Sequence, residues 1–205
     1  MVSAMVLFLV FGSGFVTVLA AKNSLPGDLL YPVKIAVEDI KIRISSSEAK
    51  PQLQADSMCN RAQELSQIVN STGDPIQTKE NVVQTVDKLQ VQVNNTRASL
   101  SSIKQTEPQK AVETMNAISD KITESEKALT EAKAKLAEGL KGQESTKAGD
   151  EVTAKIEAAV KNTAVLASEL KEAKSGIEVQ MEVKNTQPQL EIFNEASISF
   201  EDINK

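Results

Sequence analysis

The sequence predicts an all-α protein in which an N-terminal transmembrane helix precedes long antiparallel helices, arranged as an elongated helical bundle or as coiled-coil hairpins. Three observations predict this fold. The chain begins with a long apolar segment. Over most of the rest, apolar residues recur at alternating spacings of three and four, which keeps one face of a helix toward a partner helix. Apart from Pro26, the prolines fall near predicted helix starts, where a missing N–H costs little.

The N-terminal segment, residues 1–21, contains no charged side chain. At about 1.5 Å per residue, a helix of this length spans roughly 30 Å, the thickness of the bilayer core. Two interpretations compete: a retained transmembrane anchor, and a signal peptide that is cleaved near residues 18–20. The uninterrupted apolar length exceeds the usual signal-peptide core and favours the anchor.

The orientation of this anchor follows less directly from the sequence. We expect the helical part on the outer side of the membrane, and secretion after signal cleavage is the alternative. Under the positive-inside rule, this topology normally places basic residues before the apolar run. Here the first charged residue, Lys22, follows it. A native start upstream of Met1, with a short basic leader, would resolve this conflict.

Two shorter helices are expected after the anchor. Residues 24–28 predict a turn, and the first helix runs from Pro32 to about Ser45. The second helix has candidate caps at Ser46 and Ser47, and it ends near Asn70. The period of two over residues 40–44 is too short, and too deeply embedded in helical periodicity, to indicate a strand. The first helix should bury more than one side, because it carries two groups of apolar residues: Val33, Val37, Ile40 and Ile44, widened by Ile35 and Ile42.

Three long helices follow, each with an apolar seam that a single polar residue interrupts. Gly73, Asp74 and Pro75 predict the boundary before the third helix, and Pro108 lies in the start of the fourth. Glycines 139, 142 and 149 mark a flexible connection to the fifth. We interpret the polar interruptions, Thr96, Ser125 and Thr163, as tolerated small residues or register markers. The seams are Val82, Val86, Leu89, Val93, Leu100 and Ile103; Ala111, Met115, Ile118, Ile122, Leu129, Ala132 and Leu136; and Val152, Ile156, Ala159, Leu166, Leu170, Ala173 and Ile177.

These elements predict a division of the chain into four parts. Residues 1–21 form the transmembrane anchor or signal segment, and residues 22–105 form a first helical domain. Residues 106–184 form a long helical hairpin. The periodicity then fades, so residues 185–205 are expected to be a loosely structured tail.

The composition argues against catalysis. The chain has no histidine, which removes the commonest general base and the commonest transition-metal ligand. Cys59 is the single cysteine, and its helical context favours a half-buried structural thiol over a reactive one. We therefore expect no enzyme, and no catalytic, cofactor-binding or metal-binding residues. The interspersed charges, with a net charge of −5, and the few aromatics exclude a nucleic-acid partner.

Residues 24–34 read Ser-Leu-Pro-Gly-Asp-Leu-Leu-Tyr-Pro-Val-Lys, with an acidic residue at Glu38 and an Arg…Glu pattern at Arg61 and Glu64. In these features the chain resembles the bacterial family called domain of unknown function 5667, over residues of about 24–105. The resemblance implies an extracytoplasmic helical domain after a transmembrane segment, sometimes attached to cytoplasmic parts of the anti-sigma-factor type. This sequence shows no such part before the anchor, and without histidine it lacks the zinc motif that those parts often carry.

The opening element of that resemblance also makes sense from its residues alone. Gly27 permits a tight bend next to the membrane, and Asp28 caps it. Leu29, Leu30 and Tyr31 are then expected to pack back onto the first helix or to sit at the lipid interface.

The expected function is a structural or protein-interaction role, as a single-pass, membrane-anchored helical stalk. Its partners would be the lipid bilayer, through residues 1–21, and other helices, either within the chain or in a second copy. The alternative is a sensory or regulatory module of the anti-sigma-associated type that signals through its anchor. An enzyme would need a compact polar cleft, which the sequence does not suggest.

Overall fold

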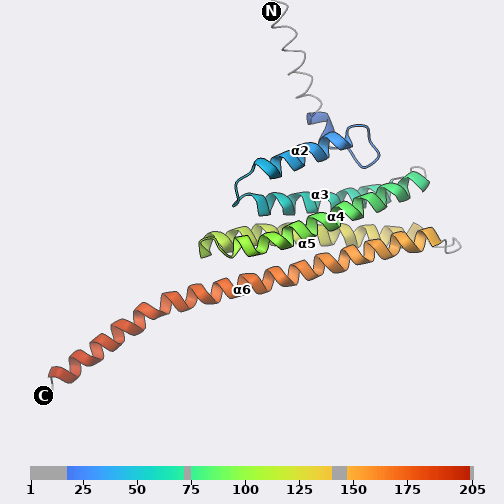
Figure 1. Cartoon of the computed structure of the whole chain (residues 1–205). Coiled ribbons are helices and arrows are strands. Elements are labelled where there is room, and N and C mark those ends of the chain that lie inside the picture. Colours follow the sequence, from blue (N-terminus) through green and yellow to red (C-terminus); the bar gives the residue numbers. More distant parts are fainter. Residues whose placement is uncertain (1–17, 72–74, 140–146, 204–205) are drawn as a thin grey trace, which may run out of the picture.

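The computed structural model describes residues 18–71, 75–139 and 147–203 (Figure 1). Its helices are α2 (Tyr31–Ile44), α3 (Lys50–Asn70), α4 (Pro75–Ile103), α5 (Pro108–Gly139) and α6 (Lys147–Ile203), and residues 18–21 form a further helical turn. The described ranges contain no strand. The prediction of an all-α fold is therefore confirmed.

Four helices begin at prolines, as the sequence predicted, whereas Pro188 lies inside α6 and not near a helix start. Pro32 and Pro51 lie in the first turns of α2 and α3, and Pro75 and Pro108 are the first residues of α4 and α5. At these positions proline removes an N–H group that would have no intrahelical partner. The predicted caps at Gly73 and Asp74 and the predicted linker glycine 142 lie outside the described residues.

Helices α3 to α6 form a bundle. Helix α3 packs against α4 and α5, and α6 packs against the same two helices from the other side. Consecutive helices run antiparallel, since Ser99 near the end of α4 donates a hydrogen bond to Gln54 near the start of α3. The predicted antiparallel hairpins are thus present, as α3–α4 and α5–α6 (Figure 1).

The two hairpins lie against each other in parallel register. Asp87 of α4 pairs with Lys155 of α6, and Arg97 pairs with Glu169 further along both helices. In the same way, Asp56 of α3 pairs with Lys121 of α5, and Gln63 bonds Glu124 further along both helices. Helix α3 therefore runs parallel to α5, and α4 runs parallel to α6.

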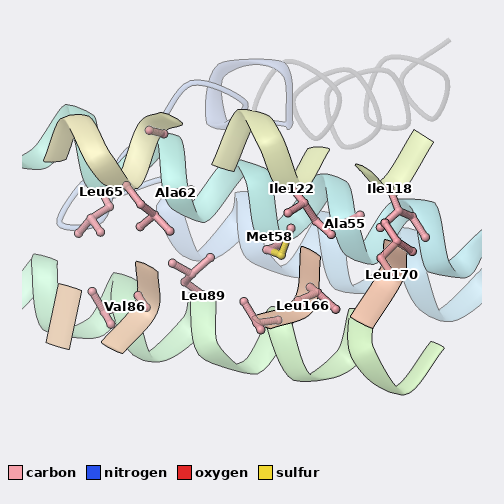
Figure 2. Packing of buried hydrophobic residues seen from close by; sticks show 14 of the residues in the cluster. Ala55, Met58, Ala62, Leu65, Val86, Leu89, Ile118, Ile122, Leu166 and Leu170 are labelled. Carbon is pink, nitrogen blue, oxygen red and sulfur yellow. The ribbon is translucent and has the colours of Figure 1, made fainter. Parts of the chain in front are cut away.

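The core is narrow and aliphatic, and it follows the predicted seams. Figure 2 shows side chains of α3, α4, α5 and α6 meeting along the bundle axis. Every predicted seam residue is buried, apart from the partly buried Leu136, and the polar interruptions Thr96, Ser125 and Thr163 are buried with them. A single hydrophobic cluster includes residues on both sides of the predicted division near residue 105.

Helix α2 differs from its prediction. It packs against α3 alone among the described helices, and Tyr31 is its one buried residue. Val37, Ile40 and Ile44 are 37%, 56% and 79% exposed. The prediction that this helix buries more than one side is wrong for the described chain, because only one of its faces has a neighbouring helix.

Residues 1–17, most of the predicted anchor, lie outside the described residues, and no helix within the described ranges is both long and apolar enough to cross a membrane. At the other end, α6 continues as a helix to Ile203 and extends beyond the other helices (Figure 1). The predicted tail, residues 185–205, is thus mostly helical backbone, and how loosely it is held stays a prediction.

Candidate functional site

The candidate site is a group of interacting polar side chains between α2 and α3, which we name the α2–α3 polar cluster. It consists of Tyr31, Lys34 and Glu38 from α2 and Arg61 and Glu64 from α3. Spacings of three and four place the first three on one face of α2, and a spacing of three does the same for the pair on α3. The 3.6-residue period of each helix therefore places both groups in the interface between α2 and α3.

Arg61 lies at the centre of this cluster and is only 1% exposed. Its Nη2 atom is 2.7 Å from Oε2 of Glu38 and 3.0 Å from Oε1 of Glu64. Its Nη1 atom donates a hydrogen bond of 2.6 Å to the hydroxyl of Tyr31, and the guanidinium carbon lies 5.5 Å from the centroid of the Tyr31 ring. A buried charge is tolerated only with such compensation.

Glu64 is the second buried charge, and both of its oxygens are engaged. Oε2 accepts a hydrogen bond of 2.9 Å from the Tyr31 hydroxyl, and Oε1 lies 2.7 Å from Nζ of Lys34. Lys34 also donates to the backbone carbonyl of Ser24 at 3.2 Å. Two cations and two carboxylates thus neutralise one another, and the cluster connects the chain just before α2 with the bundle.

Glu38 lies at the less buried edge of the cluster. Besides Arg61, it accepts hydrogen bonds from Asn60 at 3.1 Å and from Ser57 at 3.4 Å. Burial raises the pKa of the Glu38 carboxyl above its ordinary value, while the charge of Arg61 acts in the opposite direction. The Glu38 carboxylate is therefore held by donors on three residues of α3.

Tyr31 uses its hydroxyl as both acceptor and donor, toward Arg61 and Glu64 respectively. Burial raises the pKa of this phenol above its ordinary value of 10.0, because the tyrosinate would be desolvated and would face the charge of Glu64. The hydroxyl consequently stays protonated at neutral pH and acts as a fixed bridge between the two buried charges.

The turn that precedes α2 has the geometry that the sequence predicted. Gly27 has a φ of +100°, and a Cβ atom there would lie 2.6 Å from the side-chain amide nitrogen of Asn81 on α4. Asp28 accepts a hydrogen bond of 2.7 Å from the backbone N–H of Leu25. The bend expected at Gly27 is confirmed, whereas Asp28 does not cap α2: its carboxylate closes the preceding turn, and the N-cap residue of α2 is Leu30, without a side-chain cap.

Leu29, Leu30 and Tyr31 were expected to pack back onto the first helix or to lie at the lipid interface, and the structure places Tyr31 and Leu29 differently. Tyr31 is buried, but against Arg61 and Glu64 of α3 instead of its own helix. Leu29 is 93% exposed, so it does not pack back onto α2. Its other expected place, at a lipid interface, stays a prediction.

A cavity of about 630 Å³ opens beside the cluster, between residues 18–25 and helices α2 and α3. Lys34, Glu38 and Glu64 reach its wall, and Lys22 and Lys41 also line it. The first three already bond partners within the protein. Nowhere in the described ranges do His, Cys, Asp and Glu side chains form a group that could hold a metal ion.

Cys59 on α3 is buried against α5, more deeply than the half-buried position that the sequence predicted. Burial raises its pKa to about 11, and the neighbouring carboxylate of Glu124 acts in the same direction. Because the thiolate is the reactive form, this environment suppresses nucleophilic chemistry at neutral pH.

All five members of the cluster belong to the features that carry the family resemblance, but the sequence predicted no shared role for them. Ser57 and Asn60, which bind Glu38, were not predicted. A usable signal was present: charged residues spaced three and four apart on the otherwise apolar α2, and again on α3, indicate two polar faces suited to each other.

Comparisons with known proteins add one positive finding. No curated protein and no solved structure matches the chain. The family model described as Domain of unknown function (DUF5667) matches residues 23–139, more than half of the chain, and so extends past the expected 24–105 to include α5. The whole α2–α3 polar cluster lies within the matched residues, and the chain belongs to the family described as Domain of unknown function (DUF5667).

Proposed function

We propose that this protein is a single-pass, membrane-anchored extracytoplasmic helical protein with a structural or protein-interaction role and no catalytic activity. The observation that carries the proposal is the α2–α3 polar cluster, which fastens the chain that follows the apolar segment to the bundle. Lys34 bonds both Ser24, before α2, and Glu64 of the bundle.

The way in which α2 is held supports this role. Tyr31 is its one buried residue, so little apolar area holds α2 on α3. Ion pairs and hydrogen bonds are directional, and a buried set of them specifies one arrangement of two elements more than it adds stability. A cluster of this kind suits a joint that must keep a fixed angle between an anchor and a stalk.

The polar groups themselves support a non-catalytic role. The charges of Arg61 and Glu64 are compensated inside the cluster, and Tyr31 bridges them with its proton held. The raised pKa of Cys59 disfavours its nucleophilic form. These groups stabilise an interface, and a catalytic acid or nucleophile would instead face a substrate.

The test uses the full chain expressed in bacterial cells. It should stay with the membranes after alkaline carbonate washing, and protease added to intact cells should remove the helical bundle. A Phe11→Arg variant, which places a charge within the apolar segment, should lose membrane retention. Recovery of the unaltered chain in the wash, or protection of the bundle in intact cells, would contradict the proposal. Mass measurement of the mature N-terminus separates a retained anchor from a cleaved signal peptide.

A sensory or regulatory module that signals through its anchor is the second candidate, and the same cluster favours it, because it couples the anchor-proximal turn to the bundle. Arg61→Met should separate the two roles. A signalling protein would lose its effect on gene expression while still in the membrane. If the protein is a structural stalk, Arg61→Met should leave gene expression unchanged. The same proteins should still cross-link to the distal part of its bundle.

A further inference from the structure

Helix α2 presents a second apolar face that no described element covers. Val37, Ile40 and Ile44 follow one another at spacings of three and four, and all three are exposed. At about 100° per residue, Ile40 lies half a turn away from Tyr31, which faces α3. A helix packed on a bundle normally carries polar residues on its outer face. This stripe therefore calls for a covering partner.

The border of the stripe is basic. Lys41 and Arg43 are both exposed, and they lie on opposite sides of Ile40 around the helix. Asp39 is the exposed carboxylate of α2, one turn from Arg43. An apolar stripe between cationic side chains is the pattern of a helix that lies in the plane of a membrane surface, where the cations reach the phosphate headgroups.

The position of the stripe also points toward lipid. Val18 and Leu19 are exposed, and they line the cavity of about 630 Å³ together with Val37 and Lys41. Figure 1 shows the helical turn at residues 18–21 on the side of α2 away from α3. The chain before this turn, residues 1–17, carries no charge. The exposed stripe is thus continuous with the end of the apolar segment.

We propose that α2 lies in the membrane interface, with Val37, Ile40 and Ile44 among the lipid chains just below the headgroups and with Lys41 and Arg43 on anionic headgroup phosphates. This inference rests on the proposed anchor, which brings α2 to the bilayer. A symmetric contact with a second copy is disfavoured, because it would bring the same basic side chains of both copies together.

The test exploits the absence of tryptophan from the chain. Ile40→Trp in the full chain, reconstituted into vesicles of phosphatidylcholine and phosphatidylglycerol, should emit at shorter wavelength than an exposed tryptophan. Lipids with brominated acyl chains should quench this emission several-fold more than that of a control. The control is Val91→Trp, at a position of α4 that is 55% exposed, as Ile40 is 56% exposed, on a helix that does not contact α2.

The outcomes separate this inference from the proposed function. If the protein floats with the vesicles in a density gradient but Ile40→Trp is quenched no more than Val91→Trp, the inference fails and the proposed anchor stands. If the chain does not float, the anchor itself fails. A blue-shifted emission that brominated lipid does not quench, and that reverts on dilution, would assign the stripe to a second copy and overturn the inference.

The basic border has its own readout. In the Ile40→Trp background, replacing Lys41 and Arg43 by glutamine should reduce quenching in vesicles that contain phosphatidylglycerol and leave it nearly unchanged in pure phosphatidylcholine. Equal quenching with and without these substitutions, in both kinds of vesicle, would remove headgroup binding from the proposal. Far-ultraviolet circular dichroism of each variant verifies that the helices are retained.

Discussion

Arg61 on α3 donates a hydrogen bond of 2.6 Å to the hydroxyl of Tyr31 at the start of α2, across thirty residues of sequence. The same guanidinium group pairs with Glu38 and Glu64. The buried side chain of Arg61 therefore bonds two residues of α2, Tyr31 and Glu38, and one residue of its own helix, Glu64. This arrangement makes Arg61 the residue on which the attachment of α2 most depends.

Replacing Arg61 by methionine should destabilise the protein strongly. The change leaves Glu38 and Glu64 without their central partner, and breaking a buried ion pair from one side typically costs about 3–5 kcal/mol. Arg97→Met is the matched control, because Arg97 also bonds a carboxylate, that of Glu169, but at a partly exposed site. Its cost should stay below about 1 kcal/mol. Urea denaturation followed by circular dichroism measures both, and similar losses would contradict a special role for Arg61.

The ionisation of Tyr31 can be observed directly, because it is the single tyrosine of a chain without tryptophan. Burial raises its pKa above the ordinary value of 10.0, so the folded protein should show no tyrosinate absorbance at a pH about one unit above that value. Adding denaturant at the same pH should produce the signal at once. Tyrosinate absorbance in the folded chain near its ordinary pKa would refute the buried bridge.

The same shift has a consequence for stability. Because the folded state holds the phenol proton more tightly than the unfolded state, Tyr31 contributes stability that is complete below pH 10.0 and is lost as the pH rises toward the raised pKa. The variant Tyr31→Phe has no such proton. Its free energy of unfolding should therefore decline less steeply in alkaline solution than that of the unaltered protein, although it starts lower because two hydrogen bonds are gone.

One chemical change should have opposite effects at two glycines. Gly27→Ala forces a side chain into a left-handed backbone conformation and against Asn81, so it should cost about 1–2 kcal/mol or more. Gly176→Ala adds a methyl group in open space within α6 and should gain about 0.5–1 kcal/mol, because alanine favours the helix. Thermal unfolding of both variants measures the contrast, and a stabilising Gly27→Ala would refute the strained turn.

Thr96 should be a source of instability in the core. Its buried hydroxyl has no hydrogen-bond partner among the described residues, whereas the equally buried Thr163 donates to the carbonyl of Ala159 at 2.9 Å. Thr96→Val keeps the shape and removes the unsatisfied group, so we expect it to stabilise the protein by roughly 1 kcal/mol or more relative to Thr163→Val. Equal midpoints for the two variants in urea would show that Thr96 finds a partner in solution.

Some of this structure was accessible from local rules. Proline positions predicted where α2 to α5 begin, and the spacing of apolar residues predicted the seams of α4, α5 and α6, including the buried Thr96, Ser125 and Thr163. The bend at Gly27 was predicted because few residues other than glycine adopt a positive φ. The residues of the α2–α3 polar cluster were noticed, but their meeting was not predicted, since residues such as Tyr31 and Arg61 are far apart in the chain.

Local chemistry in the sequence therefore specifies the helices, the starts of α2 to α5 and the face that each long helix buries, because these follow from the 3.6-residue period and from backbone chemistry within a few residues, but it did not predict that α6 continues to Ile203. Only the tertiary structure decided which helices share those faces: that α3 runs parallel to α5 and α4 to α6, and that Arg61 meets Glu38 and Tyr31. It also decided that the second apolar stripe of α2 faces outward. Periodicity identifies a buried face without identifying its partner, and several pairings of similar aliphatic seams satisfy the same pattern.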